Sequence, residues 1–373
     1  MNSRLDEISS FIVMDIVREA NRFSDAIHFE VGQPDLPPAP KVVKELCNIP
    51  NSGFGYTPSM GLKSLQEAIA MHYKEVYGVS VDSKNILITP GTSGAFLVAF
   101  ALACDYSGNL GISDPGYPCY KNISHLLNIN PVAINVYKDS NYQITKEHLK
   151  GLNLDALQIS NPANPTGNIY DNSNLEELIE YCLDNNIAFI SDELYHGLTY
   201  DVKIDSALKY SDEVFVINGF SKYFCMPGFR VGWLIVPDRF IKKAEEIAQN
   251  IFISAPTISQ YAAINAFDYE YLKGVNLEFK RRRDYLYNEL KDIFKIESIP
   301  QGAFYIWADI SKYSNDSLDF SKKLLQDLHV ATTPGIDFGK NGTNRYIRFA
   351  YTRESEHLKE GVERIKRYLG SFF

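Results

Sequence analysis

One stretch decides how the chain is arranged: VFVINGFSKYFCMPGFRVGW, residues 214–233. Its first four residues are apolar and rich in β-branched types, a pattern that predicts a buried strand. The chain then breaks at Asn218-Gly219 and delivers Ser221 and Lys222, with Arg230 eight residues after the lysine. The sequence therefore predicts a buried strand whose end carries a hydroxyl, an amine and a guanidinium.

Lys222 stands among aromatic residues, between Phe220 and Tyr223. Burial there would disfavour the charged form, lower the pKa of the lysine and make its free amine available as a nucleophile or base. A lone lysine at a strand end more commonly extends into solvent, and that is the alternative interpretation. Ser221 and Arg230, however, are suited to binding a phosphate. An amine beside a phosphate site is typical of a phosphorylated aldehyde held as a Schiff base.

Two runs, GFSK at 219–222 and RVG at 230–232, resemble the attachment-site signature of the class I/II aminotransferases. These are fold-type I enzymes that use pyridoxal 5'-phosphate (PLP). The resemblance implies that Lys222 binds PLP covalently and that Ser221 and Arg230 hold its phosphate. Cys225 departs from the signature, because the family usually has Gly, Ser, Ala or another small residue there. A cysteine can pack as a small hydrophobe, so the departure is minor.

Length and composition agree with a globular enzyme. A chain of 373 residues with 45% apolar residues favours one large and one smaller domain. The net charge of -9 argues against nucleic acid or an anionic membrane as partner. The 5 cysteines lack metal-ligand spacing, so no metal site is predicted. Unpaired cysteines, an acidic N-terminus and no membrane-spanning apolar run predict a cytoplasmic protein.

A second phosphate-binding element is predicted after the apolar strand at 86–89. The chain there continues through a glycine-rich turn containing Thr92, Ser93 and Gly94 into an apolar helix. Unpaired backbone N–H groups and the positive end of the helix dipole would face a phosphate. An ordinary strand-to-helix turn has a similar sequence, and the run matches no nucleotide-binding signature.

Two further strand ends present groups suited to a planar ring. Tyr117 lies between two prolines after the strand at 110–112, where it could stack on a ring or pack in the core. Asn164 lies in the rigid turn NPANPTG at 161–167. By resemblance to the family, Tyr117 stacks on the cofactor and Asn164 reaches the phenolic oxygen of its pyridine ring, beside the substrate.

Asp192 directly follows the apolar strand at 188–191. A buried carboxylate is costly unless it meets a cation or hydrogen-bond donors. A protonated pyridine nitrogen would be such a cation, and the resemblance implies that Asp192 binds it while Tyr195 binds the phenolic oxygen. On the residues alone, a helix-capping aspartate with a packing tyrosine is the stronger interpretation.

The resemblance also assigns groups outside the sheet. Gly32, in a segment like the family's GxPD motif, would border the substrate carboxylate. Arg348 stands among apolar residues on an expected strand, where an arginine seldom lies without an anion, and by resemblance it pairs with the substrate α-carboxylate. Arg345 is the rival, although its place at the strand start suggests solvent. Tyr56 would reach the cofactor phosphate of the other subunit, which implies a homodimer with shared active sites.

The alternation of strand, turn and helix from 83 to 233 predicts an α/β fold. Its mostly parallel central sheet would be covered by helices on both faces, as in fold-type I PLP-dependent transferases. We expect a large PLP-binding domain at 41–265 and a smaller α+β domain built from 1–40 and 266–373. The basic run at 280–284 is interpreted as a solvated helix face.

These features together predict a transaminase that moves an amino group between an α-amino acid and a 2-oxo acid, with PLP as cofactor. Lys222, Asp192 and Tyr195 are the expected catalytic residues, and Lys222 would act as general acid and base. By resemblance alone, 2-oxoglutarate and glutamate form one substrate pair. A C–S β-lyase or another fold-type I enzyme is the alternative, because the same scaffold supports several reactions. An aspartate-preferring branch carries lysine at about the position of Ser93; its absence leaves dicarboxylate specificity unsupported, although an arginine elsewhere could substitute.

Overall fold

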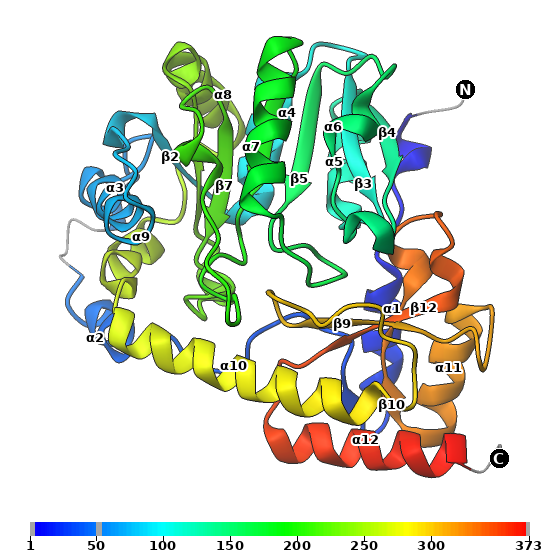
Figure 1. The fold of residues 1–373 in the computed structure, drawn as a ribbon. Helices are drawn as coiled ribbons and strands as arrows, with labels where there is room; N and C mark the ends of the chain where they lie inside the picture. Colours follow the sequence, from blue (N-terminus) through cyan, green and yellow to red (C-terminus); the bar gives the residue numbers. More distant parts are fainter. Residues whose placement is uncertain (1–3, 50–53, 371–373) are drawn as a thin grey trace.

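The computed structural model describes residues 4–49 and 54–370. Its largest element is a seven-stranded sheet in the order β2-β8-β7-β6-β5-β3-β4 (Figure 1). Every neighbouring pair is parallel except the two pairs that β8 makes. The strands are β2 (Ile86–Thr89), β3 (Asn109–Asp114), β4 (Asn130–Asn135), β5 (Ala156–Ser160), β6 (Ala188–Asp192), β7 (Phe215–Gly219) and β8 (Gly232–Ile235). The predicted mostly parallel sheet is confirmed.

Helices cover both faces of this sheet (Figure 1). Because side chains alternate along a strand, Val216 of β7 joins one apolar cluster while Phe215 and Ile217 join the other. Both faces of the strand are therefore buried, which explains its continuous apolar sequence. One cluster contains residues of α3 (Lys63–Tyr77), α7 (Asn172–Asp184) and α9 (Thr257–Ala263), and the other contains residues of α4 (Gly91–Ala103), α5 (Pro118–Leu126) and α8 (Ile241–Ile251).

A second part of the molecule lies below the sheet in Figure 1. It contains a three-stranded sheet in the order β11-β12-β9 and a two-stranded parallel sheet of β1 and β10. The strands are β1 (Ile27–His28), β9 (Tyr305–Asp309), β10 (Val330–Ala331), β11 (Thr333–Pro334) and β12 (Tyr346–Ala350); the helices are α1 (Ile12–Ala20), α10 (Tyr269–Leu290), α11 (Ser317–Leu328) and α12 (Ser355–Gly370). Both ends of the chain contribute, while the domain limits at 40/41 and 265/266 stay a prediction.

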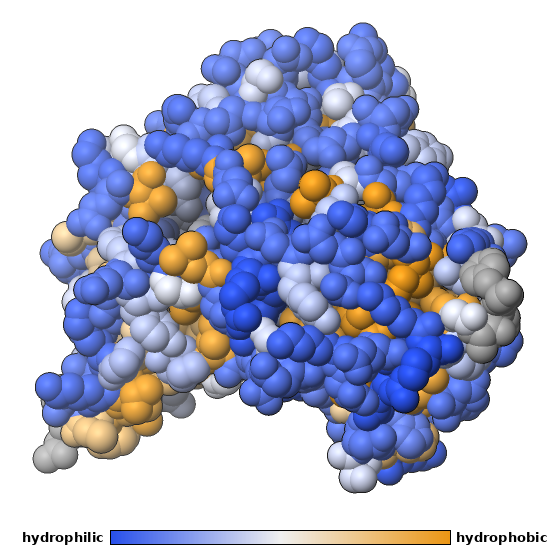
Figure 2. Space-filling view, turned by 60° about the horizontal axis from the view of Figure 1, so that its bottom comes forward, coloured by the Kyte–Doolittle hydropathy of each residue, from blue (hydrophilic) through white to orange (hydrophobic). Residues whose placement is uncertain are grey.

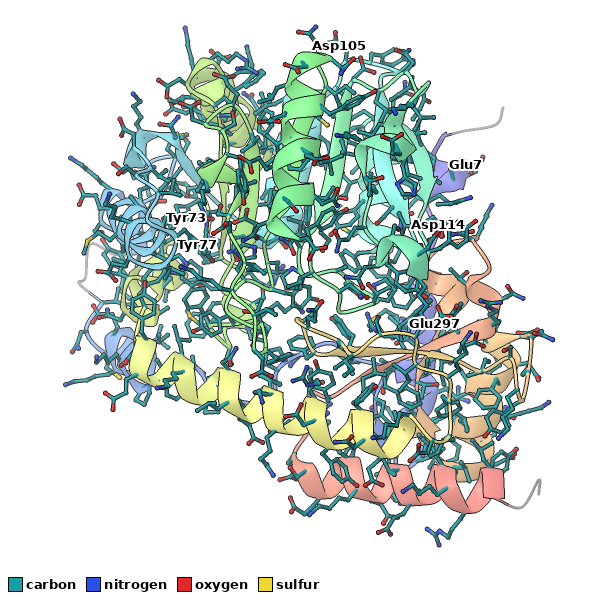
Figure 3. All side chains as sticks on the ribbon, viewed as in Figure 1. Glu7, Tyr73, Tyr77, Asp105, Asp114 and Glu297 are labelled. Carbon is teal, nitrogen blue, oxygen red and sulfur yellow. The ribbon has the colours of Figure 1, made fainter. Side chains whose placement is uncertain are left out.

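The two parts are joined close to the carboxyl end of β3. The carboxylate of Asp114 (Figure 3) accepts backbone hydrogen bonds from Lys340 at 2.9 Å and Asn341 at 3.3 Å. The backbone N–H of Gly116 also donates to the carbonyl of Phe338 at 2.8 Å.

Two short helices, α2 (Pro40–Leu46) and α6 (Lys146–Leu149), complete the α-helices of the described residues. None of the helices described is long and apolar enough to cross a membrane.

The interpretation of 280–284 as a solvated helix face is wrong for two of its residues. Arg282 is 3% exposed, and its guanidinium binds the carboxylates of Asp35 and Glu278 at 2.7 Å each. Arg283 is 5% exposed and donates to the carbonyl of Pro300 at 2.7 Å. Glu278 is a local partner four residues before Arg282, but Asp35 and Pro300 lie outside this helix, and the local sequence gave no sign of them. The outward face around α10 and α12 is nevertheless mainly hydrophilic (Figure 2).

Candidate active site

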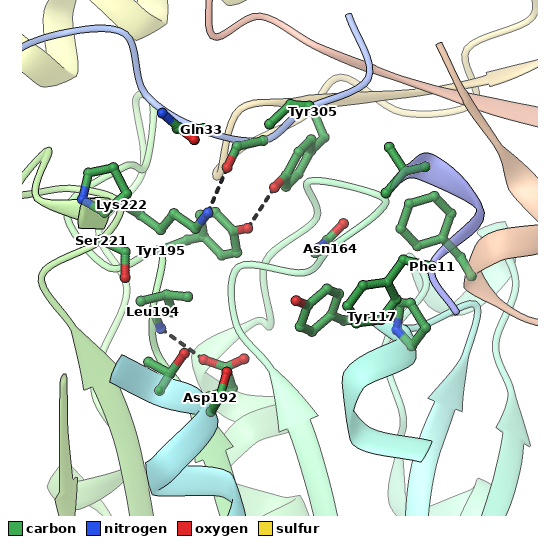
Figure 4. A pocket seen from close by; sticks show the side chains of 18 of the residues that line it. Phe11, Gln33, Tyr117, Asn164, Asp192, Leu194, Tyr195, Ser221, Lys222 and Tyr305 are labelled. Carbon is green, nitrogen blue, oxygen red and sulfur yellow. Dashed lines mark hydrogen bonds between the residues drawn. The ribbon is translucent and has the colours of Figure 1, made fainter. Parts of the chain in front are cut away.

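A cavity of about 340 Å³ lies at the carboxyl ends of the large sheet, within the size range of small-molecule sites. Residues that follow β2, β3, β6 and β7 line one side of it, and residues of the second part line the other (Figure 4). From the sequence-predicted set, the lining includes Gly32, Thr92, Ser93, Tyr117, Asn164, Asp192, Tyr195, Ser221, Lys222, Arg230 and Arg348. Gly94 and Tyr56 lie outside this lining, and Tyr56 is 81% exposed.

Lys222 projects into this cavity from the turn after β7 (Figure 4). Its Nζ donates a hydrogen bond to the carbonyl of Gly32 at 2.6 Å and lies 5.6 Å from the ring centre of Phe304. Burial lowers the pKa of Lys222 to about 8, and the positive charges of Arg348 and Arg230 act in the same direction. The amine is thus easier to deprotonate than an exposed lysine, in contrast to the solvent-extended alternative.

Asp192 lies at the carboxyl end of β6 and is buried. Its carboxylate accepts hydrogen bonds from the hydroxyl of Tyr120 at 2.5 Å and from the backbone N–H of Leu194 at 3.1 Å. Burial raises the pKa of Asp192 to about 6, while these two bonds and the charge of Lys222 oppose the rise. The bond to Leu194 is a local turn interaction of the kind expected for a capping aspartate.

Sequence reasoning missed Tyr120. It lies one turn beyond Tyr117 on α5, and its ring packs edge-on against Phe96 at 5.1 Å. The strands β3 and β6 both pair with β5, and this arrangement of the sheet brings α5, which follows β3, close to Asp192 at the end of β6. No local motif therefore marks this tyrosine. The spacing of Tyr117 and Tyr120 was the one available signal, because residues three apart share a helix face.

Arg348 of β12 is buried and lines the cavity. Its guanidinium donates to the side-chain oxygen of Asn164 at 2.7 Å and to the carbonyl of Glu30 at 2.7 Å. Its Nε atom is buried and has no hydrogen-bond partner. The rival Arg345 is 46% exposed, in line with its expected position at the strand start. The arginine predicted to face the cavity is the one that lines it.

Tyr305 was also missed, although it shapes the substrate side of the cavity. Its hydroxyl is 2.7 Å from the hydroxyl of Tyr195, and the Arg348 guanidinium lies 4.2 Å from its ring centre. A Cβ atom on Gly32 would lie 2.0 Å from this hydroxyl, so the backbone approaches closely only because residue 32 is glycine. Tyr305 comes from β9 and lies 110 residues after Tyr195 in the chain.

The opposite end of the cavity is built to receive an anion. Helix α4 begins at Gly91, so the backbone N–H groups of Thr92 and Ser93 lie in its first turn. The guanidinium of Arg230 approaches this turn, because a Cβ on Gly91 would be 2.5 Å from its Nη2. Ser221 lines the same cavity. A hydroxyl, a guanidinium and a helix N-terminus therefore meet in one place.

Comparison with known proteins identifies the family. The family described as aminotransferase class I and II matches residues 24–365. The chain belongs to the class I and II aminotransferases. This aminotransferase is 37% identical to a (5-formylfuran-3-yl)methyl phosphate transaminase of Methanocaldococcus jannaschii, over 99% of each chain. It is 33% identical to a valine–pyruvate aminotransferase of Mycobacterium tuberculosis, over 98% of this chain and 97% of that one.

Solved structures agree with this assignment. The crystal structure of an aminotransferase from Mycobacterium tuberculosis matches this aminotransferase with a TM-score of 0.96 and 32% identity, over 100% of this chain and 99% of that one. The predicted fold type and the predicted transaminase activity are thereby confirmed. The family uses PLP, so the cavity of this aminotransferase has to be judged against that cofactor.

Proposed function

We propose that this aminotransferase holds PLP in the cavity described above, with Lys222 as the residue of covalent attachment. The main support for the proposal is that one cavity brings together three groups that complement PLP. The cavity contains an amine of lowered pKa, a buried carboxylate at Asp192 and the anion-binding end formed by Arg230 and the first turn of α4. These groups fit an aldehyde, a pyridine nitrogen and a phosphate respectively.

Lys222 would act as the acid and base of the reaction. Because burial lowers the pKa of Lys222 to about 8, its free-base form is more accessible near neutral pH than that of an exposed lysine, and the amine can take the proton from the substrate Cα and later return one. PLP supplies an electron-accepting ring that stabilises the negative charge formed at the Cα. Asp192 would keep the ring nitrogen protonated, and the Tyr195 hydroxyl would donate a hydrogen bond to the ring oxygen.

Arg348 and Asn164 would orient the substrate. The guanidinium of Arg348 faces the cavity between Asn164 and the ring of Tyr305, where it can pair with an α-carboxylate. Fixing the carboxylate at this point turns the Cα–H bond toward Lys222, which supplies the alignment that the proton transfer needs.

We also propose that the active form is a homodimer. Tyr56 is 81% exposed and Phe54 70% exposed, and the carbonyl of Gly55 between them accepts a hydrogen bond from Thr257 at the start of α9. Nearby, Leu46 of α2 and Ile258 of α9 line a shallow hollow with residues 225–229, between Lys222 and Arg230 in sequence. A partner covering this surface would bring its own Tyr56 toward the phosphate end. None of the 5 cysteines forms a disulfide, which is compatible with the expected cytoplasmic location.

Replacing Tyr120 by phenylalanine should lower kcat by about 10- to 150-fold, because a hydrogen bond to a charged group contributes about 1.5–3 kcal/mol. The ring would still pack against Phe96, so the fold should be kept. Loss of the Tyr120 bond also removes an effect that lowers the pKa of Asp192, so less of that carboxyl would be ionised at neutral pH. Steady-state kinetics and the pH profile of kcat measure both effects. An unchanged kcat would show that Tyr120 does not contribute to the reaction through Asp192.

The reaction type is tested with the purified protein, PLP and a panel of amino acids. Pyruvate and 2-oxoglutarate are supplied in separate reactions, and alanine, glutamate and ammonia are measured. Transamination yields one new amino acid for each donor consumed and no free ammonia. Ammonia and a 2-oxo acid produced without a new amino acid would instead identify a β-lyase.

A further inference from the structure

The part of the cavity farthest from the phosphate end has an apolar lining. Phe11, Val13 and Met14 at the start of α1 line it, together with Val31 and Phe338. These five residues are called the apolar wall below. Figure 4 shows Phe11 beside Tyr117, and the two rings stack with centres 5.9 Å apart. The wall therefore continues from the predicted cofactor-stacking tyrosine to the side where Arg348 lies.

The wall is held in place by one carboxylate. Asp337, in the 3-10 turn η9 (Gly335–Phe338), accepts the backbone N–H groups of Ile12 at 2.9 Å and Val13 at 3.2 Å. These N–H groups belong to the first turn of α1 and have no partner within the helix. Asp337 caps α1 from a segment more than 300 residues away in sequence and fixes the wall against the cavity.

The charged side chains of the cavity lining also bear on which substrates fit. Among the described residues, the basic side chains of the lining are Lys222, Arg230 and Arg348. Lys222 is the attachment residue, Arg230 lies at the phosphate end and Arg348 is required by the α-carboxylate. The acidic residues on the substrate side are Glu30 and Asp337. Glu30 is buried; its Oε1 atom lies 2.7 Å from Nδ1 of His28, and its Oε2 atom has no hydrogen-bond partner.

A second carboxylate on the substrate would therefore be disfavoured here. It would lose water on entering and would find no uncommitted guanidinium or ammonium in the described lining, while Asp337 adds a carboxylate at the apolar wall. An aliphatic or aromatic side chain would instead replace water against the apolar wall. The same holds for the 2-oxo acid, because both substrates occupy one site.

We propose that this aminotransferase takes amino acids and 2-oxo acids with an uncharged, apolar side chain, and that the apolar wall selects them. The inference rests on the proposed function, since it places the α-carboxylate at Arg348. It points away from 2-oxoglutarate and glutamate, the pair that the family resemblance implied. Val13 is the position chosen to test this selectivity, because it lines the cavity and its backbone N–H is fixed by Asp337.

Ligand binding tests the proposal without turnover. Isothermal titration calorimetry of the PLP-loaded enzyme compares 4-methylpentanoate with glutarate, two unreactive acids of similar length. We expect 4-methylpentanoate to bind at least about tenfold more tightly. In kinetics, leucine should show a kcat/KM at least about tenfold above that of glutamate. Tighter binding of glutarate, or preferred turnover of glutamate or aspartate, would overturn the proposal and indicate a cation supplied from elsewhere in the assembly.

A matched pair of variants isolates the charge at the wall. Val13→Arg introduces a guanidinium, and Val13→Gln adds similar length without charge. We expect Val13→Arg to tighten glutarate binding about fivefold or more and to weaken that of 4-methylpentanoate, whereas Val13→Gln should only weaken the latter. Equal effects of the two variants on glutarate would show that Val13 does not face the substrate. Failure of the proposed function is distinct, since then no donor would transfer its amino group.

Discussion

Replacing Lys222 by alanine should reduce turnover by at least about 10⁴-fold, because the variant loses both the covalent attachment point and the acid–base group. Lys222 is the lysine that lines the cavity among the residues described. PLP could still bind through its phosphate, at the end formed by Arg230 and α4. The expected signature is therefore bound PLP that borohydride cannot fix to the protein.

Lys209→Ala is the control for this variant. Lys209 is half exposed and pairs with Asp205 at 2.7 Å, away from the cavity lining. Its replacement should leave turnover and borohydride fixation unchanged, and circular dichroism should show both variants folded. Turnover of Lys222→Ala within tenfold of the native enzyme would rule out the assigned role of Lys222.

Replacing Arg348 by alanine should raise KM for α-amino acids by about two orders of magnitude, with a much smaller effect on PLP retention. Removing one member of a buried charge pair costs about 2–5 kcal/mol, which corresponds to roughly 30- to 4,000-fold in affinity. The side chain lies on the small sheet, across the cavity from the anion-binding end. Steady-state kinetics and PLP content after dialysis measure the two quantities.

Arg345→Ala is the matched control, because Arg345 precedes the same strand β12 and is 46% exposed. Its replacement should change KM by less than about threefold. Arg348→Lys keeps the charge but loses the two-pronged geometry, so its KM should lie between those of the native enzyme and Arg348→Ala. Loss of PLP from Arg348→Ala at unchanged KM would assign this arginine to the phosphate.

The sequence allowed prediction of the groups that follow the strands of the large sheet. Asp192, Lys222 and Asn164 each stand directly after or close to an apolar run, and parallel strands bring their carboxyl ends to one edge. Turn residues and buried strands are local features, so these site residues can be predicted from short segments of sequence. Arg348 was readable for a similar reason, as a charge within an apolar strand.

Side chains that depend on packing between distant elements were not predictable. Tyr120 meets Asp192 only because α5 lies over the sheet, and Tyr305 meets Tyr195 across the cavity. Asp337 holds α1 through backbone groups, which leave no trace in the sequence of the helix. Arg282 was misinterpreted because its partner Asp35 is 247 residues away in the chain. In each case the interaction joins parts of the chain that have no local pattern in common.

The most direct test of the account is to locate the point at which the cofactor is attached. Purified enzyme is loaded with PLP, reduced with borohydride and digested, and the modified peptide is identified by mass spectrometry. The account predicts one major modified residue, Lys222, in the segment GFSK at 219–222. A protein that takes up no PLP, or that carries the label mainly on another lysine, would contradict it.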